Sequence, residues 1–148
     1  MLDAREYLSQ VKRMKKVIQH LKDNLSYHRE AALSIRTSRF NPNGKVQSNS
    51  MHNSMEDHIL NAYDLEMKIA EKQLELEQLK HVIMNQIHDL DNYRYIEVLY
   101  YCYILNIKQD STAKEMGCSI DYVKELKKNA VKEFEAVHGT EFEPIVTG

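Results

Sequence analysis

The sequence has little of what sheets, membrane spans and secretion signals require. Its 148 residues include four Gly, two Pro and no Trp, and so few turn-forming residues favour long helices over a sheet with many turns. No apolar run approaches the roughly 20 residues of a membrane-spanning helix. The N-terminal stretch MLDAREYL contains neither a basic segment nor an apolar core of the secretory type. We therefore expect an all-α protein that works in the cytoplasm and has no membrane partner.

Cysteine, histidine and the known catalytic motifs also give no sign of a reactive site. Cys102 and Cys118 lack metal-type spacing, and we expect both to be reduced thiols that act as small hydrophobes. His81 and His88 are seven residues apart, whereas helix-borne metal pairs are usually three or four apart. The chain contains no phosphate-binding glycine loop, no G-x-S-x-G and no H-E-x-x-H. We expect neither an enzyme nor a bound metal, cofactor or small-molecule substrate.

The net charge is only −2, but the charges are segregated along the chain. Residues 1–48 carry ten Lys or Arg against four Asp or Glu, and residues 49–91 carry three against nine. Two long segments of opposite charge can neutralise each other along their flanks. The alternative is that the first segment presents a basic surface to nucleic acid.

Both of these segments have the heptad pattern of coiled-coil helices. Apolar residues recur at steps of three, four and seven over residues 4–25 and again over residues 55–90. Asp3, with Glu6 three residues later, predicts a capping box at the start of the first helix. A two-helix hairpin has too thin a core to be stable alone, so we expect a dimer or a higher oligomer. The residues expected to hold the oligomer together are Ile69, Leu76, Leu79 and Ile83.

Residues 38–54, SRFNPNGKVQSNSMHNS, separate the two heptad segments. Asn41, Pro42 and Gly44 break any helix, and the small polar residues offer no core, so this stretch predicts a loop. Long loops are either mobile or functional. The basic residues around Phe40 leave two interpretations open, a mobile hairpin tip and an arm that contacts phosphate or a partner protein.

Residues 92–137 have the layout of a helix-turn-helix. A helix over residues 109–116 would place the small Ala113 on its inner face, where a second helix can cross closely. Gly117 suits a left-handed helix C-cap, and Ser119 suits the N-cap of the next helix. That next helix carries an apolar stripe at steps of three and four: Val123, Leu126, Ala130, Phe134 and Val137. An earlier apolar face completes a three-helix core.

The second helix of this motif, from about residue 120 to residue 137, would enter the major groove of DNA. Three candidates for contact with base edges are Tyr122, Lys124 and Glu125, since Lys suits guanine acceptors and Glu suits the cytosine amino group. Five candidates for contact with phosphates are Lys114, Ser119, Lys127, Lys128 and Lys132. Over residues 92–138, seven Lys or Arg are matched by seven Asp or Glu. A lone neutral motif should bind DNA weakly, so dimerisation, a basic arm or RNA polymerase as a co-binder would have to add affinity.

Residues 92–137 resemble region four of sigma-70-type bacterial sigma factors and the matching domain of phage late-transcription regulators of the ArpU and RinA type. Residues 45–69 are similar to the V-Q-S-S … D … I-x-D-L-E-x-x-I pattern of small phage and prophage proteins of Gram-positive bacteria, which end in that domain. The matching residues are Val46, Gln47, Ser48, Asp64, Leu65, Glu66 and Ile69. The chain differs at Gln109 and Thr112, where these relatives usually have an aromatic residue and Ile.

This resemblance implies a DNA-binding transcriptional regulator in a bacterial host cell, with double-stranded DNA and RNA polymerase as partners. A two-fold dimer would then match a palindromic site. The expected organisation is a coiled-coil hairpin over residues 1–91, a helix-turn-helix over residues 92–138 and a flexible tail over residues 139–148. Two other functions remain open: a coiled-coil interaction protein whose sigma-like domain binds RNA polymerase or a host factor, and a small-terminase-like packaging protein.

Overall fold

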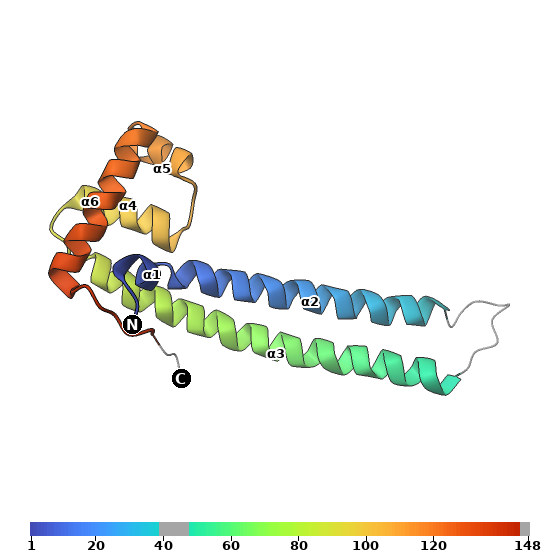
Figure 1. Cartoon of the computed structure of the whole chain (residues 1–148). Helices are drawn as coiled ribbons and strands as arrows, with labels where there is room; N and C mark the ends of the chain where they lie inside the picture. Colours follow the sequence, from blue (N-terminus) through green and yellow to red (C-terminus); the bar gives the residue numbers. More distant parts are fainter. Residues whose placement is uncertain (39–47, 146–148) are drawn as a thin grey trace. The chain divides into compact units, whose positions relative to one another are not determined.

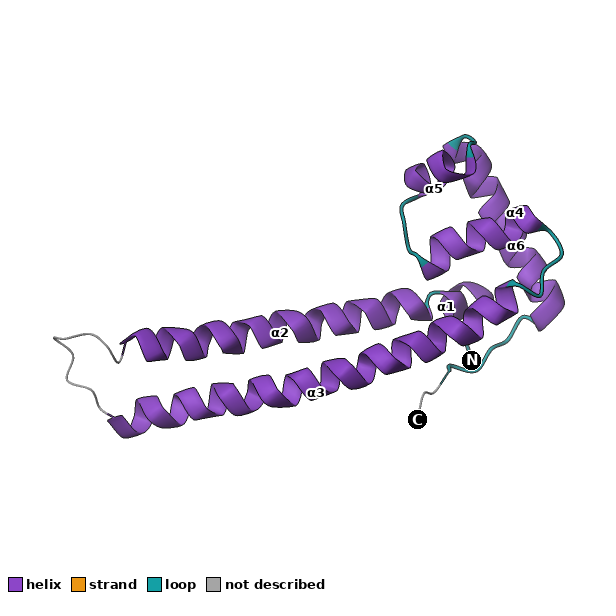
Figure 2. Cartoon of the chain, turned by 180° about the vertical axis from the view of Figure 1, so that it is seen from behind, coloured by secondary structure: helices purple, strands orange, loops and turns teal. Residues whose placement is uncertain are grey.

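The computed structural model describes residues 1–38 and 48–145, which are almost wholly helical (Figures 1 and 2). In chain order the helices are α1 (Ala4–Leu8), α2 (Gln10–Ser38), α3 (Ser48–Ile87), α4 (Tyr93–Leu99), the π-helix η1 (Tyr100–Ile104), α5 (Gln109–Met116) and α6 (Ile120–His138). Within the described residues, extended pairing is limited to one antiparallel bridge, between Leu2 and Phe142. The expected all-α fold, with a long N-terminal helix pair followed by shorter helices, is confirmed. Over the same residues, no helix is long and apolar enough to cross a bilayer.

The chain divides into two compact units, and the boundary differs from the one expected at residue 91. The first unit contains Met1–Lys15 and residues 75–148, and the second contains Lys16–Leu74. The base of the helical hairpin therefore folds with the C-terminal helices. We call the first unit the head and the second the hairpin unit.

In the hairpin unit, α2 and α3 run antiparallel and side by side (Figures 1 and 2). Ile18, Leu25 and Leu65 of the heptad rows are buried in it. Arg29 of the basic segment forms an ion pair with Glu66 of the acidic segment, as expected for flanks of opposite charge.

The prediction of a loop over residues 38–54 is wrong at its C-terminal end. Helix α3 begins at Ser48, so residues 48–54 are helical. These residues are mostly small and polar but include no Gly or Pro, and a helix that is already formed extends through such residues at little cost. Residues 39–47, which include most of the expected arm, lie outside the described part of the chain.

The core of the head joins both ends of the chain. Helix α1 begins at the predicted capping box, in which Asp3 and Glu6 each accept a hydrogen bond from the other's backbone N–H group. Phe134 of α6 is fully buried, and its ring centroid lies 6.3 Å from that of Tyr7 and 5.7 Å from that of Phe142. Tyr7 and Phe142 stack at 4.5 Å. The N-terminal and C-terminal parts of the sequence therefore share one aromatic cluster.

The prediction of a flexible tail is wrong for residues 139–145. Phe142 is only 7% exposed, and it exchanges two backbone hydrogen bonds with Leu2, of 2.8 and 2.9 Å. The N–H group of Ile145 donates to the side chain of Gln10 at 3.0 Å. Burial of the Phe142 side chain holds this segment in place. The polar residues that surround Phe142 in the sequence do not predict this burial.

The residues proposed for oligomerisation are buried within a single chain. They are between 0% and 9% exposed: Ile69, Leu76, Leu79 and Ile83. A second copy could reach them only if the helices separated. These residues are therefore not available to another chain in this structure.

Candidate nucleic-acid interface

Helices α5 and α6 of the head form a helix-turn-helix with the bounds and caps that the sequence predicts. Helix α5 ends at Met116, and Gly117 is its C-cap. The φ of 67° and ψ of 39° of Gly117 are left-handed. Helix α6 begins at Ile120, and Ser119 is its N-cap. The side chain of Ser119 accepts a hydrogen bond from the N–H group of Tyr122 at 3.1 Å. Ala113 and Val123 are buried between the two helices, as their spacing indicates. The short turn thus fixes the direction of α6.

Gly117→Ala is expected to lower the free energy of unfolding by about 1–2 kcal/mol, because a side chain in the left-handed region crowds its own carbonyl group. No other described atom lies within 4 Å of the added Cβ, so the cost is conformational and does not arise from a clash. Gly117→Asn is the matched control, since Asn tolerates this conformation better. Urea unfolding followed by circular dichroism measures both variants, and equal losses would contradict the explanation.

Thr112 of α5 is fully buried. Its hydroxyl donates to the carbonyl of Lys108 at 3.1 Å, and a buried hydroxyl that forms a hydrogen bond costs little. The neighbouring Cys102 is a free thiol, and burial raises its pKa, against the opposing effects of Lys127 and of a hydrogen bond with Thr112. This part of the core is therefore neutral, and the buried hydroxyl of Thr112 has a hydrogen-bond partner.

The π-helix η1 continues α4 and turns Tyr103 towards α6. Its hydrogen bond from Leu105 N–H to Tyr100 C=O, of 3.0 Å, spans five residues, the pattern of a π-turn, which occurs frequently at functional sites. Asn106 follows in a left-handed conformation with φ of 56°. Lys15 donates to the carbonyl of Ile104 at 2.7 Å, so the start of α2 also supports this turn.

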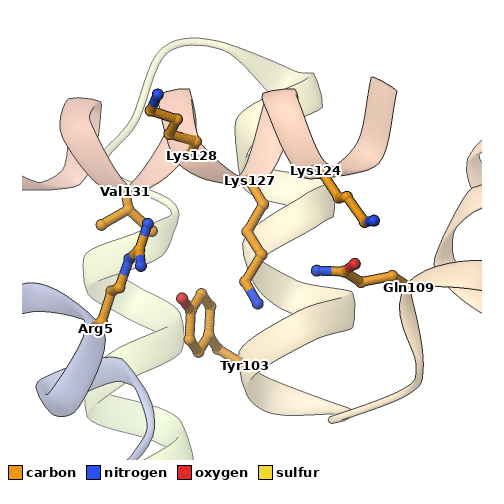
Figure 3. Close-up of a pocket in the computed structure, with 7 residues that line it drawn as sticks. All are labelled: Arg5, Tyr103, Gln109, Lys124, Lys127, Lys128 and Val131. Atoms are coloured by element: carbon orange, nitrogen blue, oxygen red, sulfur yellow. The ribbon is translucent and has the colours of Figure 1, made fainter. Parts of the chain in front are cut away.

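A cationic pocket lies beside α6, in front of the ring of Tyr103 (Figure 3). It has a volume of about 200 Å³. The described residues that line it come from α1, η1, α5 and α6, and they are Arg5, Tyr103, Gln109, Lys124, Lys127, Lys128 and Val131. Four of the seven are cationic and none is acidic. We call this site the cationic pocket.

The cations that line this pocket point in different directions, because Lys127 points towards the Tyr103 ring and Lys128 points away from it (Figure 3). Lys127 reaches from α6 to Tyr103, with its Nζ 5.1 Å from the ring centroid (Figure 3), a distance at which a cation is attracted to the ring face. Burial raises the pKa of the Tyr103 phenol, and Arg5 has the opposite, smaller effect. The phenol therefore stays protonated at neutral pH and can donate to an anion. The pocket combines several charged donors with one neutral donor.

The structure brings together three of the eight residues proposed for DNA contact, Lys124, Lys127 and Lys128. Ser119 caps α6. The other four are exposed on α5 and α6 but do not line the pocket: Lys114, Tyr122, Glu125 and Lys132.

Sequence reasoning missed Arg5, Tyr103 and Gln109 as lining residues. Gln109 opens α5, and its position at a helix start could have drawn attention to it. No local pattern links Arg5 to the other lining residues, which are about a hundred positions away. Arg5 lies near them because the core around Phe134 joins α1 to α6.

Comparisons with protein-family models, curated proteins and solved structures found no match for this chain. Among residues 1–38 and 48–145, no group of three or more His, Cys, Asp or Glu side chains could hold a metal ion. The chemistry of the cationic pocket is therefore the basis on which we assign a function.

Proposed function

We propose that the chain binds double-stranded DNA through α5 and α6, and that the cationic pocket holds a backbone phosphate. The observation that supports this is the set of four cations around one pocket with no acidic residue in its lining. Phosphate neutralisation supplies much of the affinity of DNA-binding proteins. The even charge balance of residues 92–138 conceals this local excess, and Arg5 adds a charge from outside that segment.

The second helix of a helix-turn-helix reads the major groove, while nearby residues contact the backbone. Lys124 and Lys128 lie one turn apart on α6, at the edge next to the pocket. Tyr122 and Glu125 are exposed on the same helix and outside the pocket, so they are available to base edges. In this arrangement the phosphate in the pocket sets the position of α6, and the exposed side chains supply sequence preference.

The resemblance of residues 92–137 to sigma region four extends this proposal to regulation of transcription. Region-four domains act together with RNA polymerase, so polymerase is the protein partner that we propose beside DNA. The direction of the effect on transcription would depend on the position of the site relative to a promoter.

The test is binding of a labelled pool of random-sequence duplexes, followed by fluorescence anisotropy at increasing salt. The wild-type chain should bind at low salt, and the logarithm of its affinity should fall linearly with the logarithm of salt concentration. Lys128→Glu and Arg5→Glu should each weaken binding by about tenfold to a hundredfold, since each removes a charged contact with phosphate and adds a repulsion. Both positions are exposed, so the fold should persist.

Lys68→Glu is the matched control, because Lys68 is exposed on α3 in the hairpin unit and the charge change is the same. It should retain nearly full affinity. Lys12→Glu and Lys16→Glu test the alternative basic surface on α2. Loss of binding in the α2 variants alone would assign DNA contact to that surface, and absence of binding by the wild type at low salt would refute the proposal.

A further inference from the structure

Helix α3 carries a second apolar row, separate from the one buried in the hairpin. Leu60, Tyr63, Met67 and Leu74 are between 59% and 62% exposed, and Ala70 between them is exposed as well. All five residues lie in the hairpin unit. We call them the outer row.

The spacing of the outer row indicates what kind of structure would cover it. Its members follow one another at steps of three, four, three and four, which is the pattern of a helix that packs against another helix. At a rise of 1.5 Å per residue the row is about 21 Å long. The outward face of a helix in a monomeric protein is normally polar, and a continuous exposed apolar row indicates an interaction surface. A helix of about four turns would cover it.

The charged residues on the two edges of the outer row indicate which kind of helix would bind it. Asp57, Asp64 and Glu71 are exposed and recur every seven residues along one edge of the outer row. The other edge includes Ile59, which is half exposed, and Glu66, which is paired with Arg29. One edge of the row is therefore acidic throughout, and the other has no cation of its own.

A second copy of α3 fits this surface poorly. Antiparallel packing would set the acidic edge against its own copy, and parallel packing would set it against the edge that contains Glu66. Helix α2 of a second copy offers no matching row, because its exposed large apolar residues, Val17, Tyr27 and Leu33, do not share one helical face. A helix with Lys or Arg beside its apolar row would instead form ion pairs along the acidic edge.

We propose that the outer row of α3 binds a basic amphipathic helix of a partner protein. The apolar row contributes the buried area, and Asp57, Asp64 and Glu71 select a partner of positive charge. The surface lies in the hairpin unit and all residues of the cationic pocket lie in the head. This interaction is therefore independent of the proposed contact with DNA.

The experiment uses the full-length chain and two synthetic helical peptides with the same Leu heptads. One peptide has Lys and the other has Glu at the positions beside the Leu row. Isothermal titration calorimetry should detect binding of the Lys peptide and not of the Glu peptide. The double variant Leu60→Gln and Leu74→Gln should weaken binding of the Lys peptide by about tenfold or more. Asp64→Asn with Glu71→Gln should weaken it and reduce its dependence on salt.

Leu33→Gln is the matched control, because Leu33 is 61% exposed on α2 and lies outside the outer row. It should leave peptide binding unchanged, and circular dichroism should show the same helix content in all variants. Equal binding of both peptides, binding of neither, or full binding by the double Leu variant would overturn the proposal. Sedimentation analysis covers the remaining outcome: a dimer of the wild type that the double Leu variant abolishes would assign the row to a second copy.

Discussion

Phe134→Ala is expected to lower the free energy of unfolding of the head by about 3–5 kcal/mol. Phe134 is fully buried, and its ring packs near those of Tyr7, Phe142 and His138. The substitution leaves a cavity at the point where the N-terminal turn, α6 and the C-terminal segment meet. Because small domains are stable by only about 5–15 kcal/mol, much of the population would be unfolded at moderate denaturant concentrations.

Urea unfolding followed by circular dichroism measures this loss, with Val137→Ala as the control. The spacing of the sequence places Val137 in the buried stripe of α6, but the side chain is 47% exposed. Its truncation should therefore cost less than about 1 kcal/mol. Binding of duplex DNA by the same two variants is a second measurement. Phe134→Ala should weaken it, because loss of the core also releases Arg5 from the cationic pocket. Similar losses for the two variants would contradict a core centred on Phe134.

The isolated segment of residues 92–145 is expected not to fold cooperatively, although it contains the whole helix-turn-helix. Its core also needs Tyr7 and Leu8 from α1 and Ile83 and Ile87 from α3, all of which are almost fully buried. Without them the apolar face of α6 is exposed to water. We expect low helix content, no sharp thermal transition and poor dispersion of amide resonances.

The control for this prediction is a chain in which Met1–Lys15 is joined by a short Gly-Ser linker to residues 75–148. This chain reproduces the head and should unfold in one cooperative transition. It should also retain binding of duplex DNA, because every residue of the cationic pocket is present. A well-folded 92–145 segment would show instead that the hairpin base is dispensable, and would return the domain boundary to residue 91.

Features that depend on neighbours in the chain could be predicted well. The capping box of Asp3 and Glu6 links residues three apart, and Gly117 and Ser119 act on the helix ends next to them. The heptad rows set which face of each long helix is buried. The predicted loop fails at residues 48–54 because a lack of apolar residues argues against a core and not against a helix.

The outer row of α3 is present in the sequence at an offset of two residues from the buried heptad row. One heptad row is enough to predict a hairpin, and the second row has no part in that prediction. Its importance depends on exposure, which spacing alone does not reveal. Leu60 and Leu65 are equally apolar, yet only Leu65 is buried.

The helices of this protein can be read from the sequence, because helix ends and apolar periods are set by residues a few positions apart. The helix-turn-helix layout and the positions of the lysines on α6 are local features of the same kind. The residues that lie beside α6 depend on long-range packing, which no local pattern specifies. Burial of Tyr7, Phe134 and Phe142 in one cluster brings Arg5 to the lysines of α6. Since these residues are more than a hundred positions apart in the sequence, a segment with no net charge acquires a pocket with four cations in its lining.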